Sequence, residues 1–236
     1  MAVHGKHART YVNGNDLSPY LNKFGVQMMA DTVETSAFSS SDKTYVSGLR
    51  DATMSAEGFF AGSTNQTDYV FNRALSNSAI WSYYPAGPAL GNAGYGIDTI
   101  ETSYEITSPI DNVVSVTVEG QGVIGADRIL SYHNLTSVSS SGSGSALDGG
   151  STSLLGAIGY LQVTNVSSTA IQIGVSIQHS SAGTSWANII AFSTVGGIRA
   201  ERAISSSTRI KRYLRANWDL SSTVGSITFN VGARRK

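Results

Sequence analysis

The side chains that could support catalysis or bind a metal are few in this sequence and lie far apart. The chain has no cysteine and four histidines, His4, His7, His133 and His179. Without cysteine, disulfides, thiolate nucleophiles and thiolate metal ligands are all excluded. His4 and His7 are three residues apart, but their polar, glycine-containing surroundings favour an arm-like segment over a metal site. His179 follows an apolar alternating run, where we expect a polar residue in a turn.

The other patterns of enzyme chemistry are incomplete. No Gly-x-Ser-x-Gly nucleophile elbow occurs in the sequence. Asp16, Asp31 and Glu34 lie near one another along the chain, but nothing fixes two of their carboxylates at the separation that a glycosidase needs. The glycine-rich run 91–96 lacks the lysine and the following helix of a phosphate-binding loop. We therefore predict no catalytic residue, no metal ligand and no cofactor, and we expect the chain not to be an enzyme.

A basic region in the second half of the chain is the strongest local charge feature. It contains six cationic residues: Arg199, Arg202, Arg209, Lys211, Arg212 and Arg215. A nucleic-acid site would interleave such cations with aromatic side chains, and only Tyr213 and Trp218 lie near them. The pattern favours a solvated face or a surface for an acidic partner.

The net charge of zero hides an asymmetry between two halves of the chain. Residues 1–125 contain twelve acidic and six basic residues, a net charge of −6. Residues 126–236 contain four acidic and ten basic residues, a net charge of +6. Opposite halves suit head-to-tail self-association or a chain whose two ends meet different surroundings, and chance variation of surface charge explains the difference equally well.

The composition favours a folded protein made of strands. Of the 236 residues, 41% are apolar and 56 are serine or threonine, whereas only four are proline. Small polar and β-branched residues favour strands and turns over long helices. No run approaches about 18 apolar residues, so we predict no membrane insertion. No apolar segment follows the basic residues near the N-terminus, so we expect no secretory signal.

Alternation of apolar and polar residues predicts about ten strands. In the run 99–106, the apolar side chains are expected to face the core, and an exposed acidic face is expected from Glu101, Ser103 and Glu105. In 114–119 the valines alternate with polar residues that include Glu119. Further alternating runs are 171–178, 213–218 and 227–231. The sequence thus predicts an all-β protein of sandwich or barrel type.

One helix and one domain boundary complete the predicted organisation. The helix is expected over 65–76, with Thr67 as its cap. The run 137–150 is rich in glycine and serine, and it is either a flexible linker or a long loop within one β-architecture. We place the boundary near this run and predict two domains, 1–125 and 126–236.

Four consecutive segments in the first quarter of the chain carry a more specific pattern. The run 12–21 reads VNGNDLSPYL, 30–38 reads ADTVETSAF, 42–51 reads DKTYVSGLRD, and 53–60 reads TMSAEGFF. Over residues 8–62 this order resembles the major tail (tail tube) proteins of long-tailed, non-contractile bacteriophages. The second half resembles, less specifically, a β-sandwich module at the C-terminus of such virion proteins. The resemblance implies a tail-tube-type sandwich or barrel with one short helix in 1–125, followed by a C-terminal β-sandwich.

The resemblance also implies an assembly. Proteins of this family form stacked rings, usually hexameric, whose inner sheets close into a barrel around a channel for genome delivery. The acidic strand faces would then line the channel, with lumen-facing candidates Glu101, Ser103, Glu105 and Glu119, because negative charge repels DNA phosphates. In the family a hairpin loop reaches the next ring. Here that loop is expected to comprise Phe38, Ser39, Ser40, Ser41, Asp42, Lys43 and Gly48.

The partners and location implied by the resemblance follow from that role. The chain would bind copies of itself and other tail proteins, such as the terminator, the tape measure and the distal tail protein, and double-stranded DNA would pass through it. It would be located in the virion tail after assembly in the host cytoplasm.

A second reading comes from a different functional class. The C-terminal sandwich could decorate the virion or bind a carbohydrate or host surface, for which the available aromatic residues are Trp186, Tyr213 and Trp218. Alternation places Trp218 in the core, which weighs against this reading.

Overall fold

The fold is all-β, as the composition and the alternation predicted. The computed structural model describes residues 3–38, 41–222 and 224–236, and in that part of the chain it contains fifteen strands, one α-helix and one short 3-10 helix. The elements of the first half are η1 (Gly5–His7), β1 (Arg9–Val12), β2 (Asn15–Asp16), β3 (Leu21–Glu34), β4 (Tyr45–Phe59), α1 (Thr67–Ala74), β5 (Ser78–Tyr84) and β6 (Ala93–Thr107). They are followed by β7 (Ser115–Val138), β8 (Gly142–Ser143), β9 (Leu147–Asp148), β10 (Ala157–Val166), β11 (Ile173–Ser180), β12 (Ala187–Ala191), β13 (Arg199–Ile204), β14 (Tyr213–Leu220) and β15 (Ile227–Arg235).

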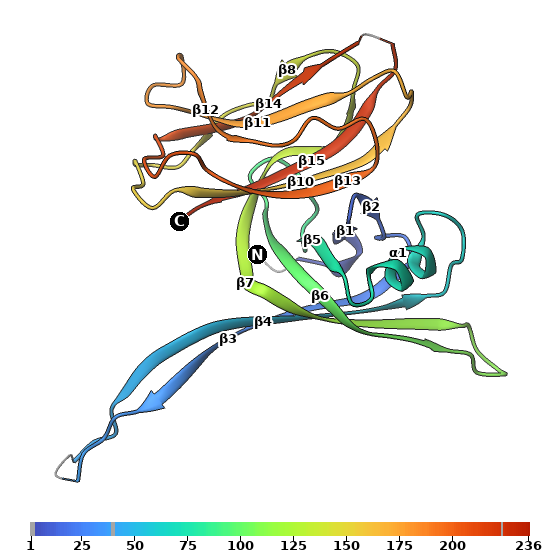
Figure 1. Ribbon diagram of the computed structural model, residues 1–236, viewed down its shortest axis with the longest axis vertical. Helices are drawn as coiled ribbons and strands as arrows, with labels where there is room; N and C mark the ends of the chain where they lie inside the picture. Colours follow the sequence, from blue (N-terminus) through green and yellow to red (C-terminus); the bar gives the residue numbers. More distant parts are fainter. Residues whose placement is uncertain (1–2, 39–40, 223) are drawn as a thin grey trace.

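The strands form two sheets, and their named pairings are antiparallel. The first sheet has ten strands in the order β13-β10-β15-β7-β6-β5-β1-β2, and β4 pairs with the N-terminal part of β7 and carries β3 on its other side. The second sheet has the order β12-β11-β14-β8, with β9 also beside β14. Figure 1 shows β7 rising from the lower part of the molecule into the upper sandwich, so one strand belongs to both.

The first half is built around a core between the sheet and α1. Strands β4 and β7 present alternate side chains, among them Met54 and Val118, to the helix, which buries Val70 and Phe71. The Phe71 ring stacks on Trp81 of β5 with their centroids 5.7 Å apart. The period of two in each strand thus puts one face of this sheet against α1 and leaves the other face without a cover (Figure 1).

The second half is a sandwich of the two sheets. The C-terminal part of β7 joins β15, β10 and β13 in one layer, and β12, β11, β14, β8 and β9 form the other. Its core includes Ile173 and Ile177 of β11, Leu214 of β14 and Phe229 of β15, all fully buried. The inward positions predicted from alternation in these strands are confirmed.

A third, smaller cluster joins the two halves. Tyr11 and Tyr84 of the first half pack with Ile129 of β7 and with Ile158 and Tyr160 of β10, and all five are buried. Buried tyrosines place large apolar area at this junction. The two cores are therefore linked by packed side chains as well as by the continuous strand.

Buried polar groups fix the junction further. Gln162 of β10 is fully buried; its Oε1 accepts a hydrogen bond from the Gly14 N–H at 2.8 Å, and its Nε2 donates to the Ile80 carbonyl at 3.1 Å. The Tyr160 hydroxyl donates to Asp127 Oδ2 at 2.7 Å, and Asp127 Oδ1 lies 3.2 Å from Arg234 Nη1. Because unpaired buried polar groups are destabilising, these bonds select one arrangement of the halves.

The helix is shorter than predicted. It covers Thr67–Ala74, because Asn65 and Ser76 have φ values of 68° and 63°, outside the helical region. Thr67 does not cap the helix through its own side chain as expected. Its hydroxyl donates to the Phe59 carbonyl at 2.8 Å and accepts from the Ala61 N–H at 3.0 Å, which ties the start of α1 to the end of β4.

The segment around the predicted boundary consists of strands and does not have the irregular structure of a linker. Strand β7 runs without a break across positions 125 and 126, so the division into 1–125 and 126–236 stays a prediction. The Gly/Ser-rich run 137–150 forms β8 and β9, which pair with β14. It is thus a loop within the sandwich. His179 lies inside β11, buried, and not in the turn that was predicted.

Two hairpins extend beyond the body in opposite directions (Figure 1). The long arm, residues 27–50, is the distal part of the β3–β4 hairpin and is exposed along almost its whole length. The short arm, residues 102–119, is the β6–β7 hairpin with its connecting loop. An isolated two-stranded hairpin is marginally stable in water, so both arms are suited to contact other molecules.

A glycine at the junction provides a test of how tightly the halves pack. A Cβ on Gly96 would lie 2.6 Å from the Tyr160 ring, whereas a Cβ on Gly197 would meet nothing within 4 Å. We expect Gly96→Ala to destabilise the protein by about 1–3 kcal/mol, because overpacking displaces a buried ring. Thermal unfolding measures this, with Gly197→Ala as the matched control. An unchanged melting temperature for Gly96→Ala would show that the junction yields easily.

Candidate assembly surfaces

The uncovered face of the sheet β3-β4-β7-β6 presents an ordered, mostly polar surface. Cross-strand pairs place residues on this face in three rows, running from β6 through β7 and β4 to β3. The rows are Glu105-Thr117-Glu57-Lys23, Ser103-Glu119-Ser55-Gly25 and Ile100-Gln121-Thr53-Gln27. We call this set the open face. A hollow of about 530 Å³ lies on it, lined in part by Gln27, Thr53, Glu119 and Gln121.

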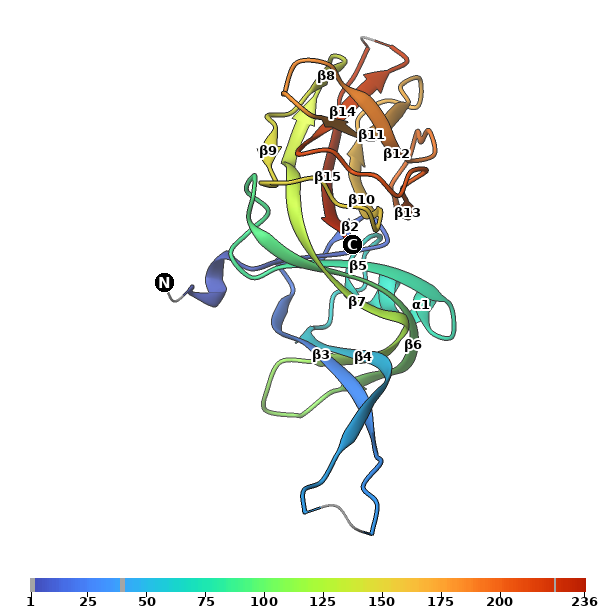
Figure 2. The ribbon, with the colours of Figure 1, turned by 90° about the vertical axis from the view of Figure 1, so that its left-hand side faces the viewer.

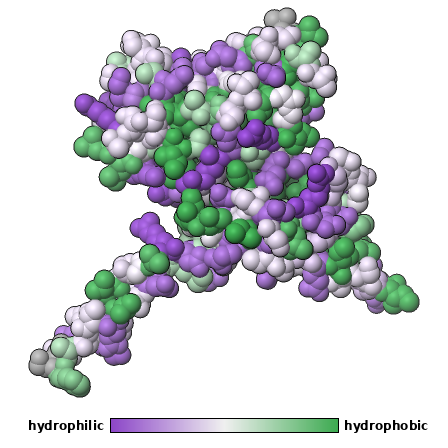
Figure 3. All heavy atoms as spheres, viewed as in Figure 1, coloured by the Kyte–Doolittle hydropathy of each residue, from purple (hydrophilic) through white to green (hydrophobic). Residues whose placement is uncertain are grey.

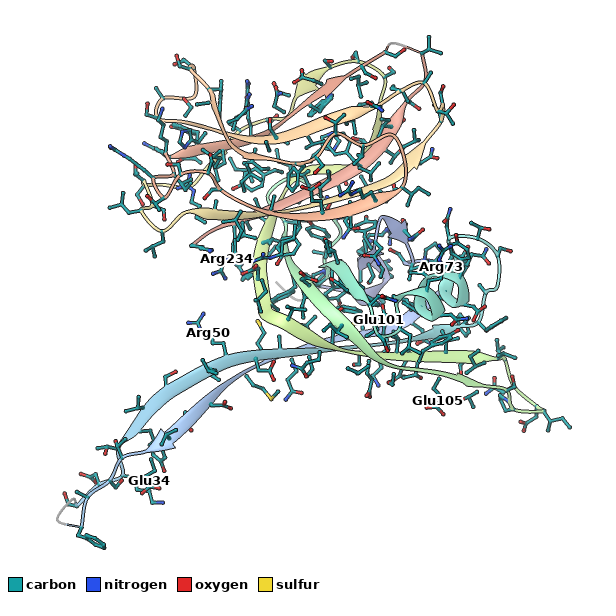
Figure 4. The ribbon with its side chains drawn as sticks, viewed as in Figure 1. Glu34, Arg50, Arg73, Glu101, Glu105 and Arg234 are labelled. Atoms are coloured by element: carbon teal, nitrogen blue, oxygen red, sulfur yellow. The ribbon has the colours of Figure 1, made fainter. Side chains whose placement is uncertain are left out.

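The open face is acidic. Its rows contain three glutamates and a single lysine, and that lysine is already engaged, because Lys23 Nζ lies 2.5 Å from a Glu57 carboxylate oxygen. In the described part of the chain, the side chains of Glu105 and Glu119 have neither a hydrogen-bond donor nor a cation as partner. Figure 4 shows Glu105 on the side of the sheet away from α1. The face therefore presents unneutralised negative charge.

Glu101 does not belong to this face, contrary to the prediction. Thr102 is an extra residue in β6, since Glu101 pairs with Gly120 and Ser103 with Glu119, and this bulge reverses the alternation. Glu101 is fully buried on the α1 side of the sheet (Figure 4), and neither of its carboxylate oxygens has a hydrogen-bond partner. Burial raises the pKa of the Glu101 carboxyl to about 8. Of the predicted lumen-facing residues, Ser103, Glu105 and Glu119 are exposed together and Glu101 is not.

The sheet that carries the open face has two free edges. Strand β3 pairs only with β4, and within the described residues nothing pairs with its other edge. Residues 102–107 of β6 pair with β7 alone, because β5 pairs with β6 only over 95–100. Free edges present unpaired N–H and C=O groups that another chain can bind. These edges are not evident from the sequence, since pairing partners are not encoded in the alternation of a single strand.

The long arm exposes large apolar side chains to solvent. They include Met28, Val33, Phe38, Tyr45, Val46 and Leu49, with exposures of 52% to 115%. Figure 3 shows apolar groups along this arm and at the tip of the short arm. Contiguous exposed apolar surface marks an interaction site.

The predicted inter-ring loop lies at the end of the long arm. Phe38 is fully exposed, Ser41 Oγ donates to Asp42 Oδ2 at 3.4 Å, and Lys43 Nζ lies 3.2 Å from Glu34. Ser39 and Ser40 lie outside the described residues. Gly48 is not part of the loop, because β4 already begins at Tyr45.

The basic region predicted in the second half is not one surface. Its members are spread over β13, which contains Arg199 and Arg202, the following loop, which contains Arg209, Lys211 and Arg212, and β14, which contains Arg215. Since β13 and β14 belong to different sheets, the sandwich core separates the ends of the region. Arg202 Nε donates to the Tyr160 hydroxyl at 3.2 Å. Arg212 binds both oxygens of Asp148, at 2.7 and 2.6 Å, which lowers the pKa of Asp148 to about 2.

The aromatic residues suggested for glycan binding are covered or buried. The Arg215 guanidinium lies over the Trp186 ring, 4.3 Å from its centroid, and Arg212 lies 5.1 Å from the centroid of Tyr213. Trp218 is buried, and its Nε1 donates to the Ser140 carbonyl at 3.0 Å. A sugar would need an open ring face, and arginines already occupy one face of each of these two half-buried rings.

Metal sites and membrane-spanning helices are two further features to consider in the described residues. They contain no group of three or more histidines, aspartates and glutamates arranged to hold a metal ion. No helix among them is long and apolar enough to cross a membrane.

Comparison with known proteins gives a distant similarity in shape. No protein-family model matches the chain, and no curated protein matches it. A chain in the virion of the native gene transfer agent particle has a TM-score of 0.42 and 16% identity over 54% of this chain and 98% of its own length. A chain of the SPP1 tail tube has a TM-score of 0.46 and 10% identity over 54% and 78%. SPP1 Dit, a hub adsorption apparatus protein of phages that infect Gram-positive bacteria, has a TM-score of 0.35 and 10% identity over 96% and 99%. At these values the similarity by itself assigns neither a family nor a function.

The buried Glu101 predicts a pH dependence of stability. Its pKa is about 8 in the folded chain against an ordinary 4.5, so the folded state holds this proton more tightly than the unfolded state. The tighter binding of this proton therefore adds to the free energy of unfolding. That contribution is fully present below pH 4.5 and is lost as the pH rises towards 8. Glu101→Gln removes the ionisation, so we expect its stability to stay nearly constant between pH 4.5 and 8, whereas that of the wild type falls as the pH rises.

Denaturant unfolding at several pH values between 4.5 and 8 measures this effect. Glu105→Gln is the matched control, because Glu105 lies on the same strand but is exposed. Parallel pH profiles for the wild type and Glu101→Gln would contradict the prediction.

Proposed function

We propose that the chain is a structural subunit of a bacteriophage tail tube, which assembles into stacked rings around a channel for the genome. The observation that carries this proposal is the open face: an acid-rich polar face of an antiparallel sheet, uncovered by the rest of the chain and bounded by two free edges. The tail-tube pattern over residues 8–62 supports the same conclusion from the sequence.

The direction of the edge strands supports ring closure. In the order β3-β4-β7-β6 each neighbour is antiparallel to the next, so β3 runs antiparallel to β6. Joining the β3 edge of one copy to the β6 edge of the next would therefore continue one antiparallel sheet around a closed barrel. With four strands from each copy, a hexamer would form a barrel of about 24 strands, in the size range that leaves an open lumen. Closure also removes both free edges.

The open face suits a channel for DNA. Glu105 and Glu119 carry charge of the same sign as the phosphates, and no cation among the described residues forms an ion pair with them. Tight binding to DNA depends on cationic contacts with phosphates, so a wall with excess carboxylate lets the duplex pass without sticking. The sandwich lies on the opposite side of the molecule from the open face (Figure 1), which would place it on the outside of the tube.

The long arm would connect successive rings. Its apolar residues, Phe38 among them, extend beyond the body, where a subunit of the next ring would cover them. At the ends of the tube the same surfaces would meet a terminator or a distal tail protein, and a tape measure protein would occupy the lumen before the genome. On this proposal the chain would be located in the virion tail, after assembly in the host cytoplasm.

Electron microscopy of the purified protein over a range of concentrations and salt tests the proposal. Hollow rings or tubes with a central channel are expected. A protein that stays monomeric at high concentration, and also when mixed with pre-formed tail ends, would contradict it.

Reversing one charge of the open face should increase the retention of DNA by the tube. We expect Glu119→Lys tubes to retain short duplex DNA, with an affinity that falls as salt rises because each new phosphate contact releases counterions. Wild-type tubes should retain none. Asp219→Lys is the matched control, since Asp219 is an exposed acid on β14 of the sandwich. Equal DNA retention by both variants would show that Glu119 does not face the channel.

Shortening the long arm should separate ring formation from stacking. A deletion of 39–43 removes the end of the arm and leaves both cores intact. We expect single rings and no tubes in electron micrographs, with an unchanged melting temperature. Tubes of normal length from this variant would remove the arm from the contact between rings.

A further inference from the structure

A groove of about 450 Å³ lies beside the free edge of β3, between the N-terminal segment and the start of that strand. Lys6, Arg9 and Lys23 line it together with Phe24 and Tyr83, whose ring centroids are 4.4 Å apart. Figure 2 shows the N-terminal segment projecting from the side of the molecule. The groove thus combines cations with an aromatic floor at the edge where a neighbouring copy would bind.

Two of these cations are not neutralised within the chain. Lys23 pairs with Glu57, but in the described residues the Lys6 ammonium has no partner and the Arg9 guanidinium donates only to the Ala8 carbonyl. Both residues are exposed. The groove therefore has a net positive charge that an acidic segment would balance.

The tip of the short arm, residues 106–114, has the complementary chemistry. Asp111 is exposed at the centre of the tip, and Glu105 directly precedes the first residue of the tip. The sequence from 102 to 122 contains no lysine or arginine. Ile110 is fully exposed and Val113 is 60% exposed. An acidic loop with protruding apolar residues fits a groove that has cations at its rim and aromatic rings inside.

Strand direction brings the two surfaces together. If β6 of one copy extends the sheet at the β3 edge of the next, their antiparallel course places the end of β6 towards the start of β3. The start of β3 contains Leu21, Lys23 and Phe24, which line the groove. The tip that follows β6 then lies at the groove of the neighbouring copy.

We propose that the groove formed by Lys6, Arg9, Phe24 and Tyr83 binds the acidic tip, residues 106–114, of a second copy of this chain. The inference rests on the proposed ring assembly and deepens it by naming the contact that orients one subunit against the next. The interface is head-to-tail, because the groove and the tip are different surfaces of the same chain, and such contacts generate rings when the rotation closes.

Charge exchange tests the contact. Lys6→Glu with Arg9→Glu reverses the groove, and Asp111→Lys with Asn112→Lys reverses the tip. We expect each variant to raise the concentration needed for assembly by about tenfold or more, since like charges then face each other. Combining all four substitutions should return it to within about threefold of the wild type. Sedimentation and electron microscopy measure assembly, and thermal unfolding confirms that each variant is folded.

Arg209→Glu with Lys211→Glu is the matched control, because it makes the same charge change on the sandwich, far along the chain from the groove. It should assemble like the wild type. If the Lys6→Glu, Arg9→Glu variant does not fold, the milder Lys6→Gln and Arg9→Gln substitutions replace it. They should raise the concentration needed for assembly by a smaller factor.

The outcomes separate this inference from the function on which it rests. Normal assembly of both reversed variants, or a combined variant as defective as either, would overturn the groove contact and leave the tube intact. A wild-type chain that never forms rings would overturn the tube and the contact together.

Discussion

One continuous strand holds this protein together. Over its 24 residues, β7 shares hydrogen bonds with β4 and β6 in its first part and with β6 and β15 in its second, so it belongs to both cores. Gly125, with φ at 75°, lies where the register with β6 shifts, and there the strand turns from one layer towards the other. The open face and the sandwich are thus fixed on opposite sides by the backbone itself, before any side chain contributes.

The junction adds specificity to this connection. Tyr160 of β10 donates to Asp127 of β7, and Gln162 of β10 reaches into the first half, where the Gly14 N–H donates to it. A Cβ at Gly14 would lie 2.6 Å from the Arg199 nitrogen, so only glycine, which also tolerates its φ of 84°, allows this approach. Buried polar bonds of this kind contribute modestly to net stability and strongly to uniqueness, because any other docking would leave them unpaired. A rigid angle between the halves is what a ring needs if the sandwich is to stay outside it.

Alternation predicted the all-β class and the faces of most strands, and it failed where local geometry broke the period. Ile173, Ile177 and Phe229 face the core as predicted, whereas the bulge at Thr102 turned Glu101 inward and left Ile100 on the open face. Glu57 was within reach of the same reasoning, since it lies between the buried Ala56 and Gly58. Lys23 was not, because its neighbour Asn22 is exposed and the register of β3 shifts between Leu21 and Lys23. The free edges and the groove were not, because they depend on which strands pair and on how the N-terminal segment folds back beside β3.

In the proposed assembly, the exposed edges and arms would impose an order on the steps. Strand β3 is long and has one unpaired edge, and Met28, Met29 and Val33 are exposed near or beyond the body. An edge of this kind associates indiscriminately unless something opposes it. The acidic open face supplies that opposition, since it repels a second open face at short range. The cations beside β3 attract only a segment that combines acid with apolar residues. In the proposed assembly, charge would therefore select the neighbour first, and edge pairing and apolar contact would then hold it. The carboxylates that are proposed to let DNA pass would also keep the subunits from stacking face to face.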